Sequence, residues 1–345
     1  MTRIEKNKQA HRDIFDKKLN RHLGVVQGPR FVTEDYVTSE KPIEYFAAQV
    51  VKGYEKWMEI SETVQDDGVP FPVLMTATHI YALCFGAEPH FYEDSNPYVK
   101  TFVRSAAEAD KIPEPKLASS RPLMRVFELA AAVQKALGKD VTLGCPDMQT
   151  GFDTACILWD KTDLMYAMVD NPAAVKRLAE KCERLLFDFV ETYRKEFPLS
   201  TFGHCPSTWT PPERGPWVSN DECGIMSQEM FEDFCLPEMI RMSQKFGSFG
   251  MHCCANAQHQ FELFKKIPNF YAFDRGPTGV GWEGDNALAV LGGPQGPTFV
   301  TGWDSALVSK FAPEGTRFIF NLNAGEDLDA IRRKLDEARN IPLVV

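Results

Sequence analysis

The 345-residue chain lacks the long apolar runs that mark membrane and secreted proteins. No apolar stretch approaches the roughly 18 residues that a membrane span needs. The N-terminal segment, MTRIEKNKQAHRDIFDKKLNRHLG, is charged throughout and has no apolar core of the kind found in secretory signals. We therefore expect a soluble, cytoplasmic protein with no membrane partner.

Basic residues are scarce relative to acidic ones, at 38 Lys and Arg against 48 Asp and Glu. The formal net charge of −10 argues against nucleic acid as a partner, because phosphate binding depends on clustered Lys and Arg. The nine cysteines lack the spacing of a small disulfide-stabilised domain, so we expect reduced thiols, some of them available as ligands.

Internal repeats and low-complexity segments are also absent, and short apolar runs alternate with longer helical patterns. Helices are predicted at 1–24, 42–62, 172–197 and 227–246. Strands are predicted at eight runs, namely 72–79, 141–151, 199–205, 217–224, 248–256, 270–276, 297–305 and 317–325. Eight strands predict an α/β fold, a (β/α)8 TIM barrel over residues 65–345 with an N-terminal helical extension, 1–64, packed on it.

Polar residues end each predicted strand. In a (β/α)8 barrel the active site lies at these C-terminal ends, so they should share one mouth. They are His79, Asp147, Gln149, His204, Cys205, Asp221, Glu222, Cys223, His252, Cys254, Asp274, Asp304, Asn321 and Asn323. Some, notably Asp304 and Asn323, would only cap the following turns. We interpret His79, His204 and Asp274 as substrate-binding residues.

The tripeptide His252-Cys253-Cys254 ends one of these strands and is the most informative feature of the chain. Because strand side chains alternate, His252 and Cys254 should face one side and Cys253 the other. An imidazole and a thiolate so placed can bind zinc, which takes N and S ligands readily. Alternatively, the two cysteines fill the core and His252 is a hydrogen-bonded interior histidine.

Two motifs resemble the uroporphyrinogen decarboxylase superfamily, in particular its cobalamin-dependent (corrinoid) methyltransferases. The first is the acidic turn Asp221-Glu222-Cys223-Gly224, followed by a helix that begins Ser227-Gln228-Glu229 and reaches Leu236-Pro237. The second is His252-Cys253-Cys254, similar to the family's His-x-Cys-Gly with Ala255 in place of glycine. The similarity covers about residues 65–340 and implies a (β/α)8 barrel.

The resemblance implies that His252 and Cys254 hold zinc. The family's methyltransferases add a later cysteine from the last strand, whereas this chain has no cysteine after residue 254. Candidates for the third ligand are Glu222, which we favour, Cys223 and Cys205. We interpret Asp221 as the catalytic general acid or a substrate hydrogen-bonding group, or alternatively as a helix cap.

The implied reaction moves a methyl group between a small molecule and a corrinoid such as methylcobalamin. Zinc would hold an acceptor thiol as the thiolate, or activate an O-methyl or N-methyl donor as a Lewis acid. The corrinoid would reside on a separate carrier protein, because the Asp-x-His-x-x-Gly motif of such carriers is absent here. The glycine-rich segment 276–285 could be a lid in which Trp282 binds substrate, or a surface turn.

Two other functions stay open. One is a metal-independent decarboxylase or lyase, and the other is a non-catalytic protein that binds a corrinoid or tetrapyrrole. The family's decarboxylases carry an arginine-bearing segment near the N-terminus, where this chain has only Gly28-Pro29-Arg30-Phe31. We therefore do not expect uroporphyrinogen as a substrate. We expect a monomer or homodimer.

Overall fold

The computed structural model describes residues 1–28, 32, 34–93, 96–276 and 286–343. Its strands are β1 (Leu23–Gln27), β2 (Glu88–His90), β3 (Tyr98–Lys100), β4 (Trp217–Ser219), β5 (Phe249–Cys253), β6 (Phe270–Arg275), β7 (Thr298–Gly302) and β8 (Phe318–Asn323). Its α-helices are α1 (Arg3–Phe15), α2 (Ile43–Val64), α3 (Ile80–Cys84), α4 (Ala106–Lys111), α5 (Arg121–Leu137), α6 (Gly151–Leu158), α7 (Lys161–Asp170), α8 (Pro172–Glu196), α9 (Gln228–Phe234), α10 (Leu236–Phe246), α11 (Phe261–Phe264), α12 (Ala287–Leu291), α13 (Ser305–Phe311) and α14 (Leu328–Asn340). Short 3₁₀ helices are η1 (Leu117–Ser119), η2 (Glu222–Ile225) and η3 (Gln258–Gln260).

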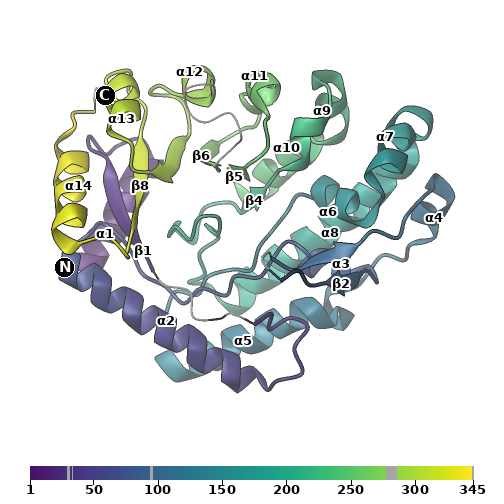
Figure 1. The fold of residues 1–345 in the computed structure, drawn as a ribbon, viewed down its shortest axis with the longest axis horizontal. Helices are drawn as coiled ribbons and strands as arrows, with labels where there is room; N and C mark the ends of the chain where they lie inside the picture. The colour runs from purple at the N-terminus through teal and green to yellow at the C-terminus, as the bar shows by residue number, and fades with distance from the viewer. Residues whose placement is uncertain (29–31, 33, 94–95, 277–285, 344–345) are drawn as a thin grey trace.

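Six strands form one parallel sheet in the order β1-β8-β7-β6-β5-β4, and β2 pairs with β3 in a separate antiparallel hairpin. The strands and helices are arranged around a ring, with α14 beside β1 and β8, and α2 and α5 on the opposite arc from α11 and α12 (Figure 1). Because the six strands are parallel, the C-terminal ends of neighbouring strands lie together at one end of the barrel.

β1 and β4 are the two edge strands of the sheet. Two extended segments, 66–76 and 141–150, lie between these edges and connect them through backbone hydrogen bonds. The backbone N–H to C=O bonds that do so are Asp67 to Gly24 at 2.9 Å, Gly144 to Pro72 at 2.9 Å, Ser219 to Met148 at 2.8 Å and Thr150 to Ser219 at 3.1 Å. Pro72 and Pro146 have no N–H to donate, which explains why these two predicted strands are irregular. The predicted (β/α)8 fold class is confirmed, with six regular strands in the main sheet.

The predicted strand at 199–205 is wrong. Thr210 donates its N–H to the hydroxyl of Thr201 at 2.7 Å, and the N–H of Phe202 donates to the hydroxyl of Thr210 at 3.2 Å. These side-chain bonds fold residues 199–210 into a loop, because they compete with strand pairing for the backbone groups. Instead, the eighth barrel position is taken by β1, which pairs with β8.

The predicted helix over 1–24 is therefore too long, since α1 ends at Phe15 and β1 begins at Leu23. The division of the chain at residue 64 stays a prediction, and β1 lies on the N-terminal side of it. The helix predicted at 172–197 is confirmed as α8. The helix predicted at 227–246 is split into α9 and α10, because Pro237 cannot donate the hydrogen bond that would continue α9.

Two polar strand ends have the predicted capping role. Asp304 accepts the N–H groups of Ala306 and Leu307 at the start of α13, and Asn323 accepts the N–H of Gly325 at 2.9 Å. Such bonds satisfy backbone donors that a helix or turn leaves unpaired. Among the described helices, none is both long enough and apolar enough to cross a bilayer.

His22 should make the barrel sensitive to acid. It is buried, its Nδ1 accepts the N–H of Phe318 at 3.2 Å, and burial followed by the charge of Arg317 lowers its pKa to about 4. The unfolded chain therefore takes up this proton first as the pH falls below about 6.5, so folding stability drops between about pH 6.5 and 4. His22→Gln should remove roughly 2–3 kcal/mol of that drop, measured by urea unfolding at several pH values. An unchanged pH slope would contradict this assignment.

Candidate active site

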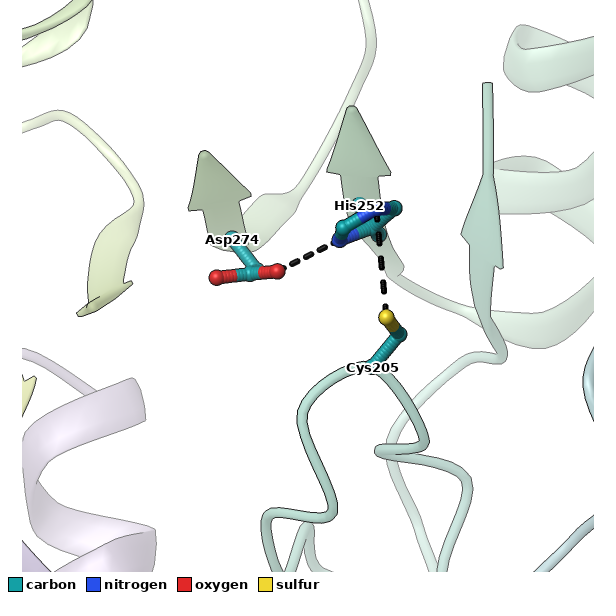
Figure 2. A group of neighbouring side chains, drawn as sticks. All are labelled: Cys205, His252 and Asp274. Carbon is teal, nitrogen blue, oxygen red and sulfur yellow. Dashed lines mark hydrogen bonds and ion pairs between the residues drawn. The ribbon is translucent and has the colours of Figure 1, made fainter. Parts of the chain in front are cut away.

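Neighbouring strands β5 and β6 bring the side chains of His252 and Asp274 together. The two residues are paired in the strand register, and both are buried. The Nδ1–H of His252 donates to Oδ2 of Asp274 at 2.5 Å (Figure 2). The opposite ring nitrogen, Nε2, is thereby left as the available ligand atom of His252.

The His252–Asp274 pair is electrostatically coupled. Burial alone lowers the pKa of His252, but hydrogen bonds with Asp274, Cys205 and Cys254 outweigh it and raise that pKa well above the usual value. Burial raises the pKa of Asp274, against the opposing effect of the hydrogen bond from His252. The carboxylate thus stabilises positive charge on or beside the imidazole.

Loop 199–210 brings Cys205 to the other side of the ring. Its Sγ lies 3.8 Å from Nε2 of His252 (Figure 2). The same loop contacts β1, where the side-chain amide of Gln27 donates to the carbonyl of Ser207 at 3.3 Å. Because β1 and β5 stand four places apart in the sheet order, the loop spans the mouth of the barrel.

Asp221 and Cys254 complete the group around His252. Oδ1 of Asp221 accepts both the N–H of Cys254 at 2.8 Å and its thiol at 3.1 Å, and it lies 3.9 Å from Nε2 of His252. Cys254 is exposed, so an external molecule can reach its sulfur. The hydrogen bond with His252 lowers the pKa of Cys254, but partial burial and the charge of Asp221 raise it above the usual value overall.

These side chains form two overlapping groups of possible metal ligands, in each of which the ligand atoms lie within 4.8 Å of one another. One group is Asp221, His252 and Cys254; the other is Cys205, His252 and Asp274. Ligands of a tetrahedral zinc ion stand about 3.3–3.8 Å apart, so separations of 3.1–3.9 Å fit such an ion. Since Asp274 occupies Nδ1, its fitting role is to orient His252, while Nε2, Cys254 and Asp221 form one three-atom group and Cys205 belongs only to the other group.

The favoured third ligand, Glu222, lies elsewhere. Its carboxylate forms an ion pair with Lys161, and it belongs to neither ligand group of the described residues. The alternative Cys223 is buried, donates its thiol to the carbonyl of Asn220 at 3.2 Å and lies 3.7 Å from the sulfur of Cys253. Of the three candidates for the third ligand, only Cys205 belongs to a ligand group of the described residues, and Asp221, predicted as the general acid, belongs to the other group.

The predicted substrate-binding residues His79 and His204 belong to neither ligand group of the described residues. Nε2 of His79 is 3.0 Å from Oδ2 of Asp35, which lines a cavity of about 150 Å³ together with Tyr36 and Thr76. His204 is buried, with Nδ1 3.8 Å from Oδ1 of Asp147. Their roles in substrate binding stay predictions.

The predicted lid and the predicted capping role of Asp221 have different outcomes. Trp282 and the proposed lid at 277–285 lie outside the described residues. Asp221 does not cap the helix that begins near Ser227, because Ser227 itself caps α9, and the carboxylate of Asp221 instead accepts hydrogen bonds from Cys254. Sequence reasoning missed Asp153, a buried carboxylate that contacts the backbone of Asp221 and Glu222. Its signal was an acidic residue within the apolar segment GFDTACIL.

The fold and site define a (β/α)8 barrel protein with a candidate metal centre at the C-terminal ends of β4, β5 and β6. Residues 71–196 match the family model described as uroporphyrinogen decarboxylase (URO-D). This match confirms the resemblance to the uroporphyrinogen decarboxylase superfamily over that segment. The candidate ligands lie beyond the matched segment, so their assignment depends on the geometry described above.

Comparison with solved structures supports the same fold. A methyltransferase from Methanosarcina mazei superposes with a TM-score of 0.63 at 11% identity, covering 97% of this chain and 98% of that chain. The homocysteine methyltransferase MmuM from Escherichia coli, in its apo form, gives a TM-score of 0.36 at 11% identity over 96% of this chain and 85% of that chain, too low for any structural argument. A search of curated proteins found no match.

The ligand assignment predicts a clear order of zinc affinities. Asp221→Asn should weaken zinc binding by about tenfold or more, because it neutralises a donor atom beside His252, whereas Cys205→Ser should have a smaller effect, because Cys205 belongs to the other ligand group. Glu222→Gln should leave zinc affinity unchanged, because Glu222 faces Lys161. Competition with a chromophoric chelator measures all three. If Glu222→Gln instead causes the largest loss of zinc affinity, Glu222 is the third ligand, as the sequence predicted.

Proposed function

We propose that this protein is a zinc-dependent methyltransferase that moves a methyl group between a small substrate and a corrinoid carried by a partner protein. The observation that supports this proposal most strongly is the convergence of His252, Cys254 and Asp221 at the end of β5. The family match and the barrel fold support the superfamily setting of the proposal. The exposed side of Cys254 is where a substrate could join the ligand group.

The donor set is suited to a soft or borderline cation. Thiolate and imidazole ligands favour zinc, and the surrounding carboxylates of Asp221 and Asp274 supply negative charge. When bound, zinc lowers the pKa of a coordinated thiol and polarises a coordinated oxygen or nitrogen. Without a cation the pKa of Cys254 is raised, so its sulfur is a protonated thiol at neutral pH.

Each protein group then has a distinct task. Asp274 holds the proton of His252 on Nδ1, which keeps Nε2 directed toward Cys205 and Asp221. Asp221 holds the end of β5 through the N–H of Cys254. As an alternative to metal binding, Asp221 could serve as the proposed general acid or substrate hydrogen-bonding group beside the exposed Cys254.

The overall transfer balances in either direction. In one direction, a thiol loses its proton and forms a sulfur–carbon bond, while the methyl–cobalt bond breaks and leaves its electron pair on cobalt. In the other, cob(I)alamin uses that electron pair to take the methyl group from an O-methyl or N-methyl donor, and the donor atom gains a proton. The site geometry is compatible with both, and the substrate decides between them.

Anaerobic spectroscopy tests this function directly. Free methylcobalamin and cob(I)alamin can replace the carrier protein, and a panel of thiols and methylated O- and N-compounds supplies the second substrate. We expect zinc-dependent interconversion of the two corrinoid spectra, which is lost on chelation, in Cys254→Ser and in His252→Ala/Cys254→Ala.

Cys84→Ser, which changes a half-buried thiol on α3, is the matched control and should keep full activity. Full zinc occupancy with no spectral change across the panel, or with any corrinoid carrier protein encoded near the gene, would contradict the proposal. Steady decarboxylation of a tetrapyrrole acid without metal would favour the lyase alternative.

A further inference from the structure

A buried carboxylate on α6 holds the backbone of the turn that carries Asp221. Asp153 is 1% exposed. Its Oδ2 accepts the N–H of Asp221 at 2.6 Å, and its Oδ1 accepts the N–H of Glu222 at 3.4 Å. Because a carboxylate can accept several hydrogen bonds, this one side chain orients two consecutive peptide groups.

The same turn is tied to β5 on its other side. The N–H of Asn220 donates to the carbonyl of His252 at 2.9 Å. The carboxylate of Asp221 accepts the N–H and the thiol of Cys254. A continuous set of hydrogen bonds therefore runs from Asp153 through Asp221 to Cys254, and it ends at the ligand atoms.

Asp153 itself stands at a rigid place in the fold. Its own N–H donates to the hydroxyl of Thr150, which caps α6, at 3.1 Å. The two preceding N–H groups, of Gly151 and Phe152, donate to the buried carboxylate of Glu238 at 2.5 and 3.1 Å. The first turn of α6 is thus fixed before Asp153 reaches the site.

A capping role alone does not explain why an aspartate stands at position 153. Serine or asparagine offers only one oxygen atom to the N–H groups of a turn. Asp153 instead offers two oxygen atoms, each of which accepts one N–H of the turn.

We infer that Asp153 is a positioning residue of the metal centre: it sets the place of Asp221, and through it that of Cys254, without contacting the ion. This inference rests on the metal site of the proposed function. Residues that orient ligands in this way change metal affinity by about 10- to 100-fold when they are replaced.

Asp153→Asn is the direct test, since its amide keeps the size but offers only one acceptor atom to the two N–H groups. We expect zinc affinity to fall by about tenfold or more. In the metal-free protein, amide hydrogen exchange should become faster at residues 221 and 222 and also at Cys254. A merely local structural role would leave the exchange at Cys254 unchanged.

Asp67→Asn is the matched control, because Asp67 is equally buried and accepts the N–H of Gly24 at 3.0 Å. It should lower the melting temperature but preserve zinc affinity and exchange at Cys254. If Asp153→Asn does not fold, Asp153→Ser takes its place in both measurements. Zinc affinity within twofold of wild type together with unchanged exchange at Cys254 would overturn the inference.

The proposed zinc-dependent function and the inference about Asp153 can be contradicted by different experimental results. If the wild-type protein binds no zinc, the metal-dependent function is wrong. Hydrogen exchange in the metal-free protein then decides the role of Asp153 alone, with faster exchange at Cys254 supporting it and unchanged exchange overturning it.

Discussion

The hydrogen bond between Nδ1 of His252 and the carboxylate of Asp274 determines the chemistry of the barrel mouth. It follows from the parallel register of β5 and β6, which sets the two residues side by side in the interior. With Nδ1 occupied, only Nε2 can serve as a ligand, and that atom faces Cys205 and Asp221. The strand pairing therefore selects both the orientation and the neighbours of the imidazole.

The other side chains of the site depend on how two irregular segments are fixed against this strand. Loop 199–210 folds on itself through Thr201 and Thr210 and presents Cys205. The turn after β4 is held from α6 by Asp153 and presents Asp221. The result is a group of soft and acidic donors with one exposed thiol, Cys254. Such a group is polar on the inside and open on one side, as a catalytic metal site must be.

Much of the fold could be predicted from the sequence, because the runs at β5 to β8 are short, apolar and bounded by turn residues. The alternation of His252, Cys253 and Cys254 also predicted which side chains would share a face. The errors arose where tertiary or side-chain bonds override local pattern. Loop 199–210 has the apolar pattern of a strand, yet its threonines bond to their own backbone.

The different surroundings of Asp221 and Glu222 could not be predicted for a related reason. Asp221 and Glu222 are adjacent in a turn, and their directions depend on contacts distant in sequence: Lys161 attracts Glu222, whereas Cys254 binds Asp221. The strand β1 was missed because its charged neighbours on α1 concealed a short apolar segment. Its place in the ring is set only by pairing with β8.

X-ray absorption at the zinc edge of the purified wild-type protein tests the central claim most directly. We expect about one zinc per chain, with one sulfur ligand at about 2.3 Å and nitrogen or oxygen ligands at about 2.0–2.2 Å. The sulfur atom is that of Cys254. Zinc surrounded only by nitrogen and oxygen, or protein that stays metal-free after purification with zinc present, would contradict this claim.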